Sequence, residues 1–515
     1  MANTSLFTSA HSRPPPRADA RNEAGGAAYS YAPRARLAQL AATGTLADGF
    51  YSTAQTQLAD VLDAARAVSP EFVAKAAVHA RRSGAMKDMP ALLTAYLTVA
   101  DPDLSARCFK RVIDNGRMLR NFVQIVRSGA AGRSSLGSRP KRLVKEWLEQ
   151  APIETLMATA TGSDPSLADI VRMVHPAPAS AERRAFYGWL IGKPYDVAAL
   201  PARIASFEAW KRDPAGALPD VPYEWLTSHP LSKAQWARLA ERMGWQALRM
   251  NLNTLARHGA FDVNRVADKV AARLSDRAAQ RKARVMPYQL MTALAQTGPA
   301  VPLKVKAALE KALEASLSTV PAIAGRVVVC PDVSGSMSAP TTGHRKGATT
   351  AVRCIDVAAL VAAAILRTNR TARVLPFDVT VATIVLDPWA RVAVNAAALA
   401  AIGGGGTNVS APLALLNDER ATVDLVVIVS DNQSWIDPAG GGATATMTQW
   451  SKLKDRNPGA KLICVDIQPY GTTQARDRAD IMNVGGFTDA AFDAMARFAS
   501  GRTRDWVEIV EATKV

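Results

Sequence analysis

The stretch that most constrains the fold is RVVVCPDVSGSMS, residues 326–338. Residues 327–330 form a short, β-branched apolar run, which is typical of a strand buried on both faces of a parallel sheet. Asp332, Ser334 and Ser336 follow at every second position. Because these residues follow directly after a strand, their carboxylate and two hydroxyl groups can point toward the same position. Mg²⁺ prefers oxygen ligands of this kind. Taken alone, the stretch also fits a simple Ser/Gly/Asp turn.

Two later stretches favour the cation site over the simple turn. Gly403–Asn408, GGGGTN, is a glycine loop that contains the hydroxyl group of Thr407. Leu425–Asp431 is a second apolar run, expected to be a buried strand, and it ends in a carboxylate. Ligand sites of doubly wound sheets lie at the carboxyl ends of strands. The predicted ligands of a divalent cation, most simply Mg²⁺, are Asp332, Ser334, Ser336, Thr407 and Asp431.

From Arg326 onward the chain alternates predicted strands and helices, the rhythm of a mostly parallel sheet covered on both faces. The predicted strands are Val327–Cys330, Val374–Phe377, Thr380–Leu386, Leu425–Ser430 and Leu462–Ile467. The predicted helices lie near Ala351–Leu366, Asn395–Ala401, Thr446–Lys454 and Asp489–Ala499.

The chain before Arg326 has a different sequence pattern, without the alternation of strands and helices. Residues 1–25 are polar, contain a proline run and lack the apolar core of a secretory signal, so we expect a flexible arm. From Arg34 to about Leu317 apolar residues recur at helical spacing, with breaks at Gly and Pro and no strand candidates. Many helices with short links predict an α-solenoid or ring. The predicted domains are thus 26–322, helical, and 323–515, α/β.

Hydrophobicity and cysteine content indicate where the protein works and which structural links it lacks. The longest apolar helical patch, Val357–Leu366, is too short to span a bilayer, so we expect a soluble cytoplasmic protein. The four cysteines are scattered and form no CxxC pair, which argues against a zinc site and a disulfide framework.

Positive charge is concentrated before residue 326. Residues 1–325 hold 43 Lys/Arg and 27 Asp/Glu, whereas residues 326–515 hold 19 and 18. A strongly basic half beside a near-neutral half suggests that the first half binds an acidic polymer. A solvated basic surface is the alternative.

The basic residues gather between Arg107 and Lys145, on two predicted helices, a Gly/Ser-rich loop and the next helix start. Guanidinium groups on such a loop suit phosphate contacts. The predicted contact residues are Arg117, Arg120, Arg133, Arg139, Lys141, Arg142 and Lys145 in this stretch, with Arg172 and Arg257 further along the chain. Beside Arg257, the polar side chains of Asn251, Asn253 and His258 fit either base contacts or links between helices, and we favour the links.

No nucleophile–base pair, P-loop or GxSxG motif is present, so we expect no enzymatic activity. A metal-dependent nuclease would need further carboxylates near Asp332, and the nearby spares are Asp356 and Asp378.

Together the two halves resemble the Ro autoantigen family, in its bacterial form: a TROVE domain of HEAT-like helical repeats followed by a von Willebrand A-like domain. The stretches that carry the resemblance are NEAGG (22–26), MKDMPALL (86–93), RVIDNGRMLRNFVQIVRSG (111–129), PSLADIVRMVHP (165–176), MNLNTLARHG (250–259) and VVVCPDVSGSMS (327–338).

The resemblance implies a helical ring whose hole admits single-stranded 3′ ends of misfolded RNA, and a basic outer surface for small noncoding Y-like RNA. It implies a role in RNA quality control and stress survival, with polynucleotide phosphorylase tethered through an RNA, and no membrane or DNA partner. It places the family's RNA-contacting histidine at His175, its basic loop and helix at residues 133–145, and a metal-ion-dependent adhesion site at the five predicted ligands. A cation-dependent protein-interaction scaffold without RNA binding is the alternative function.

Overall fold

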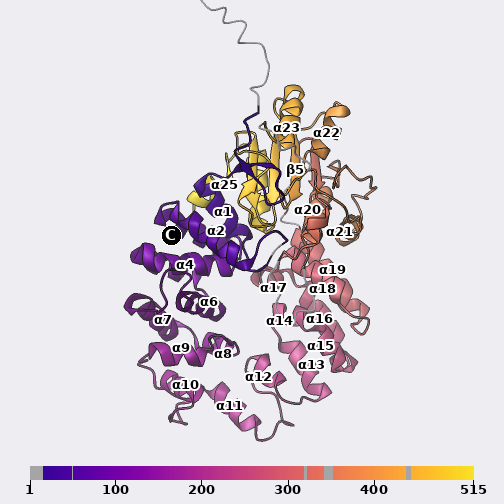
Figure 1. Cartoon of the computed structure of the whole chain (residues 1–515). Coiled ribbons are helices and arrows are strands. Elements are labelled where there is room, and N and C mark those ends of the chain that lie inside the picture. The colour runs from indigo at the N-terminus through magenta and orange to yellow at the C-terminus, as the bar shows by residue number, and fades with distance from the viewer. Residues whose placement is uncertain (1–14, 49, 318–319, 321, 342–351, 436–441) are drawn as a thin grey trace, which may run out of the picture. The chain divides into compact units, whose positions relative to one another are not determined.

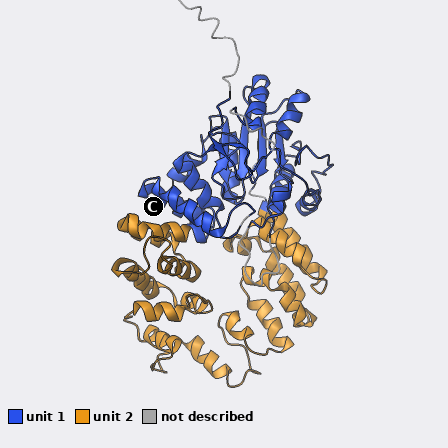
Figure 2. Ribbon diagram, viewed as in Figure 1, with its two compact units in different colours: residues 1–89, 317–514 blue, residues 90–316, 515 orange. Residues whose placement is uncertain are grey.

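In the computed structural model of this chain (Figure 1), residues 15–48, 50–317, 320, 322–341, 352–435 and 442–515 are described. The chain divides into two compact units (Figure 2). Unit 1 contains residues 1–89 and 317–514, and unit 2 contains residues 90–316 with residue 515. These units do not follow the predicted limits at residues 25 and 322, because residues 15–89 pack with the C-terminal part of the chain.

The core of unit 1 is a five-stranded parallel sheet in the order β4-β3-β5-β6-β8. Its strands are β3 (Val327–Pro331), β4 (Arg373–Val374), β5 (Leu425–Ser430), β6 (Lys461–Asp466) and β8 (Ile481–Gly485). The strands β3, β5 and β8 are buried along their whole length, as expected for a sheet covered on both faces.

Alternate side chains of these strands face opposite sides of the sheet. Val328 and Val426 belong to a core cluster with Leu413 and Trp450, which come from α22 and α23. The intervening side chains, such as Val329, face the side on which α20 packs against β3 and β5. The helices of this part are α20 (Cys354–Thr368), α21 (Val392–Ala400), α22 (Ala411–Asp418), α23 (Ala445–Arg456), α24 (Asp489–Ala499) and α25 (Trp506–Glu511).

The predicted strand Thr380–Leu386 is wrong. The segment is rich in β-branched residues, but it makes only a single bridge, between Phe377 and Val381, and Val385 is 95% exposed. The predicted helix near Ala351 begins at Cys354, and Ala351 itself lies outside the described residues.

The N-terminal part of unit 1 corrects two further predictions. Strands β1 (Ala20–Arg21) and β2 (Ala27–Ser30) pair antiparallel, and β2 also pairs with β7 (Thr472–Thr473). Strands therefore exist before Arg326, and the described part of the predicted flexible arm, residues 15–25, is structured. Tyr29 of β2 is fully buried in the sheet's core cluster.

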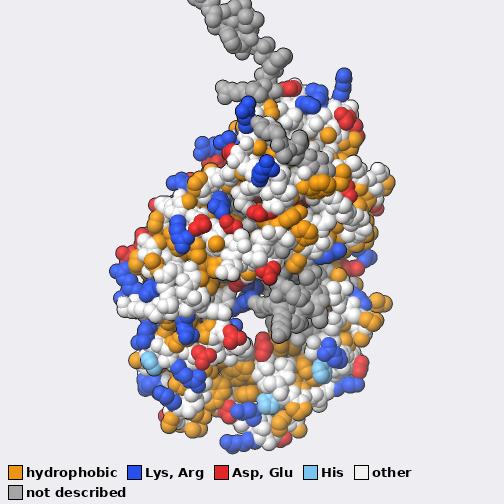
Figure 3. All heavy atoms as spheres, viewed as in Figure 1, with side chains coloured by type: hydrophobic (Ala, Val, Ile, Leu, Met, Phe, Trp, Pro, Cys, Tyr) orange, Lys and Arg blue, Asp and Glu red, His pale blue; other side chains and the backbone are white. Residues whose placement is uncertain are grey.

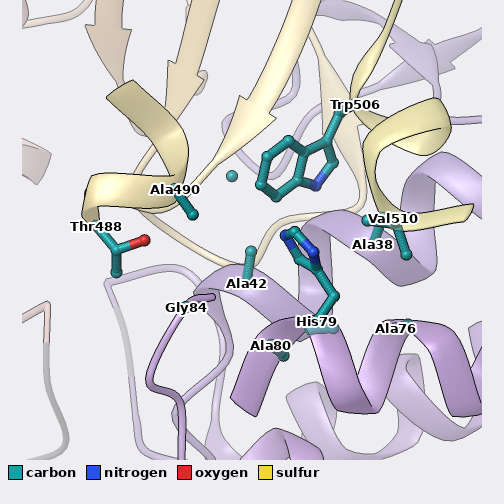
Figure 4. A pocket seen from close by; sticks show the side chains of 12 residues that line it. Ala38, Ala42, Ala76, His79, Ala80, Gly84, Thr488, Ala490, Trp506 and Val510 are labelled. Carbon is teal, nitrogen blue, oxygen red and sulfur yellow. The ribbon is translucent and has the colours of Figure 1, made fainter. Parts of the chain in front are cut away.

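Three N-terminal helices complete unit 1: α1 (Pro33–Thr43), α2 (Ala54–Arg66) and α3 (Pro70–Arg82). Helix α1 packs against β8 and α25, and α3 packs against α25. Between them lies a small pocket (Figure 4), with room for about one water molecule. The rings of His79 and Trp506 meet there edge to face, with centroids 5.1 Å apart. His79 Nε2 and Trp506 Nε1 are buried without a hydrogen-bond partner among the described atoms.

Unit 2 is helical throughout its described residues, apart from turns and loops. Its helices are α4 (Asp88–Ala100), α5 (Pro102–Val112), α6 (Gly116–Arg127), α7 (Ser138–Gln150), α8 (Ile153–Thr159), α9 (Leu167–Val174), α10 (Ala181–Ile191), α11 (Ala202–Trp210), α12 (Tyr223–Thr227), α13 (Lys233–Arg242), α14 (Trp245–Met250), α15 (Leu252–Arg257), α16 (Val266–Ser275), α17 (Arg277–Lys282), α18 (Pro287–Gln296) and α19 (Leu303–Ser316).

These helices begin where the sequence supplies side-chain caps, for example at Asp101, Asn115, Ser166 and Ser232. Each packs mainly against helices close by in sequence, such as α5 on α7, α7 on α9 and α16 on α19. Such local packing is typical of helical repeat folds. All four cysteines are buried and unpaired, and no described helix is both long and apolar enough to cross a membrane.

Candidate functional site

Asp332 stands at the carboxyl end of β3 and is anchored from both neighbouring segments. Its N–H donates to the Val429 carbonyl over 2.9 Å, and its backbone bridges to Phe377. Its Oδ1 accepts the Ser334 N–H at 2.9 Å, and its Oδ2 accepts the Ser430 hydroxyl at 2.6 Å. The carboxylate is therefore fixed in orientation at the edge of the sheet.

Ser334 and Ser336 follow in a tight turn that includes the 3₁₀ helix Gly335–Ser338. Their hydroxyl oxygens lie 3.4 Å apart and both side chains are buried. The structure thus brings Asp332, Ser334 and Ser336 together as predicted from their spacing.

The glycine loop lies directly against this turn. The Gly335 N–H donates to the Gly405 carbonyl at 2.8 Å. A Cβ at Gly404 would lie 2.6 Å from Asp378 Oδ2, and a Cβ at Gly406 would overlap the Trp435 indole. Only glycine allows this close approach, which carries Thr407, 2% exposed, toward the turn.

Asp431 follows β5, the strand next to β3. Its Oδ1 accepts the Gln433 N–H at 3.2 Å, but its Oδ2 is buried without a hydrogen-bond partner among the described atoms. Its charge acts on Asp332, which follows β3. The five predicted ligands therefore come from three adjoining segments, and none is more than 6% exposed.

The two carboxylates are buried and electrostatically coupled. Burial, together with the nearby charge of Asp431, raises the pKa of Asp332 to about 7. Burial also raises the pKa of Asp431. A buried pair of carboxylates with an unsatisfied oxygen is costly without a cation, so these residues fit a divalent ion with oxygen ligands.

The spare carboxylates are committed to other structural bonds. Asp378 Oδ2 accepts the Gly405 N–H at 3.2 Å, and Asp378 Oδ1 accepts the Thr380 N–H at 3.1 Å. Asp356 pairs with Arg353 at 2.6 Å where α20 begins. Their engagement gives no support to the nuclease alternative.

Several residues near this site come from the N-terminal part of the chain and were not predicted from the sequence. Asn22 Nδ2 donates to the Ser434 carbonyl at 2.6 Å, and the Glu23 N–H donates to Gln433 Oε1 at 2.8 Å. In the loop between α1 and α2, the Tyr51 N–H donates to the Tyr470 hydroxyl over 3.3 Å. No periodicity marks these residues, because their partners lie more than 280 positions away.

The predicted contact residues of unit 2 fall into two groups. In the first, guanidinium groups hold backbone carbonyls: Arg120 donates to Thr159 at 2.8 Å, Arg133 to Ser135 at 2.9 Å and Arg172 to Ile191 at 3.1 Å. These arginines shape loops and helix ends.

The side chains of the second group are exposed or partly exposed. Arg139 pairs with Asp103 at 3.2 Å and Arg142 with Glu146 at 3.7 Å, which are exposed and weak ion pairs. No hydrogen bond or ion pair within the described residues engages the side chains of Arg117, Lys141, Lys145 and Arg257. Figure 3 shows Lys and Arg side chains gathered over α7, α9 and α10.

His175 is exposed and ends α9 in the left-handed conformation, with φ of 51°. Asn251 bonds the Ala247 carbonyl and Tyr223, and Asn253 bonds the backbone of Gln296 and Gly298. These two asparagines therefore link segments of unit 2, which confirms the structural interpretation that the sequence favoured.

Comparisons with known proteins agree with this architecture. The family model of the Ro60 vWA domain matches residues 326–499. The RNA-binding protein RO60 of Deinococcus radiodurans is 26% identical over 521 residues, which cover 93% of this chain and 95% of that protein. The crystal structure of the Deinococcus radiodurans RO (RSR) protein matches with a TM-score of 0.61 and 23% identity, covering 92% of this chain and 100% of that one. The structural likeness shows the fold, a helical region followed by a von Willebrand A domain.

Proposed function

We propose that this chain, a homologue of the Ro proteins with a von Willebrand A domain of the Ro60 type, binds RNA through unit 2. The observation that carries the proposal is the distribution of charge. Unit 2 holds 33 Lys/Arg and 20 Asp/Glu, whereas unit 1 holds 29 and 25. A positively charged surface attracts the phosphate backbone, and the relative of matching length is named as an RNA-binding protein.

The RNA class follows from the family resemblance. Small noncoding Y-like RNA would contact the basic surface at residues 133–145 and His175, and single-stranded ends of misfolded RNA would bind the helical repeats. Such an activity would serve cytoplasmic RNA quality control and stress survival, with polynucleotide phosphorylase recruited through a tethering RNA.

The test uses Lys141 and Lys145, which lie one turn apart on α7. No described ion pair holds either side chain, so we expect the double variant to keep its fold. We expect the Lys141→Ala, Lys145→Ala variant to bind a structured RNA with a 3′ tail roughly 3- to 10-fold more weakly, with a shallower dependence on salt. The matched control removes two exposed positive charges from unit 1, Lys452→Ala and Arg476→Ala. Equal affinities for both double variants and the wild type would contradict RNA binding at α7.

We further propose that the candidate cation site holds Mg²⁺, with Ser334, Ser336 and Thr407 as direct ligands and Asp332 and Asp431 partly through water. The ion would offer an open coordination position to an acidic group and neutralise the buried carboxylates. Nothing around the described ligands supplies a general base, so the proposed role is docking and stabilisation, without catalysis.

A second candidate function is a cation-dependent protein-interaction scaffold. Three exposed apolar side chains favour it: Phe50 packs on Tyr51, Trp435 covers Gly406, and Val379 adjoins Asn408. Copurifying RNA separates the candidates. Purified protein free of RNA, with no binding to added RNA at low salt, would favour the scaffold.

A further inference from the structure

Unit 2 contains a cavity of about 360 Å³ between α5, α7 and α8, which lies within the size range of small-ligand sites. Its floor is apolar, because the side chains of Phe109, Ile113 and Leu143 line it and all three are buried. The Trp147 indole forms a further wall and is partly exposed. An apolar floor beside an indole suits an aromatic ring, since such rings stack on one another.

Hydrogen bonds hold the walls of this cavity in place. Trp147 Nε1 donates to the Ile113 carbonyl at 3.0 Å, which joins α7 to the end of α5 and sets the orientation of the indole. At the link between α7 and α8, the Arg183 guanidinium of α10 donates to the carbonyls of Leu148 and Ala151. The cavity is therefore preformed, and a ligand that enters it does not have to order the protein around it.

Polar side chains at the rim are placed to recognise the edge of a ring. Glu146 and Gln150 both line the cavity and lie one turn apart on α7. The described ion pair of Glu146, with Arg142, is 3.7 Å long, which is beyond hydrogen-bond distance. No hydrogen bond or ion pair within the described residues engages Gln150. The rim thus offers a carboxylate that accepts hydrogen bonds beside an amide that donates and accepts them.

A row of positive charge lies along α5 beside the cavity. Arg107, Lys110 and Arg111 are exposed, and Lys110 lines the cavity. Their spacing of three and four residues places them on one side of the helix. Among the described residues, none forms a hydrogen bond or ion pair with these three side chains. They would attract the phosphates of a nucleic acid strand, whereas the carboxylates of Asp114 and Glu146 disfavour a phosphate inside the cavity itself.

We propose that this cavity binds a nucleobase that carries an exocyclic amino group, as cytosine does. The ring stacks on Trp147 and the amino group donates to Glu146, which is the contact that a carboxylate makes with cytosine. Uracil has a carbonyl oxygen in place of this amino group, so its edge would turn an acceptor toward the carboxylate. Because the charges on α5 need several phosphates, the base belongs to a strand. The inference rests on the proposed RNA binding by unit 2 and adds a base-selective site to it.

The test measures the affinity of the full chain for single-stranded oligocytidine and oligouridine of equal length, by fluorescence anisotropy at neutral pH. We expect the wild type to bind oligocytidine roughly 5- to 20-fold more tightly than oligouridine. Glu146→Met keeps the length of the side chain and removes the acceptor, so this ratio should fall to about one. Both RNAs carry the same charge, so the ratio does not respond to the negative charge that the substitution also removes.

The matched control is Glu149→Met, which removes an exposed carboxylate from the same helix at a position that does not line the cavity. It should keep the wild-type ratio. A second variant, Trp147→Leu, should bind both RNAs roughly 5- to 20-fold more weakly, because it loses the stacking surface. Free cytidine should displace oligocytidine from the wild type only at concentrations far above the Kd of the strand.

Each result separates the base site from the proposed function. A wild-type ratio of one, the same ratio for Glu146→Met and Glu149→Met, or binding of structured RNA alone would overturn the base site and leave RNA binding in place. A cooperatively melting protein that binds neither the single strands nor structured RNA would overturn the proposed function as well. Cytidine that binds as tightly as oligocytidine would overturn the assignment of the base to a strand.

Discussion

Asp332 and Asp431 are buried side by side, and within the described residues no Lys or Arg pairs with either. A charge removed from water is costly unless it is paired. The raised pKa values of both carboxylates express that cost, because folding disfavours the charged form. This buried pair of carboxylates is the feature on which the proposed cation site rests.

The first prediction concerns Asp431→Asn. Without a divalent cation, the variant should melt at the same or a higher temperature than the wild type, because the raised pKa means that the charged form of Asp431 opposes folding at neutral pH. With Mg²⁺ at about 100 times its Kd, the wild type should gain about 2.7 kcal/mol and the variant much less. Calorimetric melts of both proteins in EDTA and in Mg²⁺ test the expected melting temperatures and the expected gain in stability. A variant destabilised equally in both conditions would refute the argument.

His79 makes the second prediction. Burial lowers its pKa from 6.5 to about 4, so the folded state keeps the imidazole neutral while the unfolded chain takes up a proton. Stability should therefore fall as pH drops from about 6.5 to 4, by at most about 3 kcal/mol from this group. In His79→Gln the loss between pH 7 and pH 5 should be smaller, measured by urea unfolding. Parallel pH profiles for both proteins would contradict the assignment.

At the scale of elements, the glycine loop gives a matched pair. Gly404→Ala places a Cβ 2.6 Å from Asp378 Oδ2 and 2.9 Å from the Val333 carbonyl, whereas a Cβ at Gly405 meets nothing within 4 Å. We expect Gly404→Ala to lose about 1–3 kcal/mol and much of its Mn²⁺ affinity, because the loop must shift. Gly405→Ala should keep both, as measured by denaturant unfolding and Mn²⁺ titration. Equal effects of the two substitutions would show that the packing of the glycine loop does not determine the geometry of the candidate cation site.

The predictable elements were those with a strong local signal. The strands β3, β5 and β6 are apolar runs and appear within two residues of their predicted limits. Strand β8, IMNVG, was missed because Asn483 and Gly485 break its apolar run, and its stability comes from pairing with β6. Strands β1 and β2 are short and depend on β7, which lies far along the chain.

The same distinction applies to the site. The five candidate ligands were predicted because each follows a strand or glycine loop with its own local pattern. Tyr51 and Asn22 were not, since a loop tyrosine or asparagine is common and only tertiary contacts bring these two to the sheet edge. Among the basic residues, sequence could not separate Arg120 and Arg133, which hold carbonyls, from Lys141 and Lys145.

At the scale of the molecule, unit 1 is built from both ends of the chain. Helix α1 covers β8, and Tyr29 lies in the core cluster of the sheet. A fragment of residues 317–515 should therefore expose apolar surface and bind a hydrophobic dye. Coexpression of residues 1–89 should restore a compact complex with a cooperative melt, seen by size exclusion and calorimetry.

The control for that experiment is Tyr29→Asp in the 1–89 fragment. A buried carboxylate at a position with no exposure should prevent association. If residues 317–515 alone melt as cooperatively as the complex, the N-terminal part is not integral to the unit.

This construction has a consequence for synthesis on the ribosome. Helix α1 emerges early, but its partners β8 and α25 are translated more than 430 residues later. At usual elongation rates that interval is on the order of tens of seconds, during which α1 can pack on α2 and α3 but the part of its surface that contacts β8 and α25 has no native partner. Unit 2 therefore has time to fold before the strands that complete the sheet of unit 1 have been made, and the residues before 90 must wait for them.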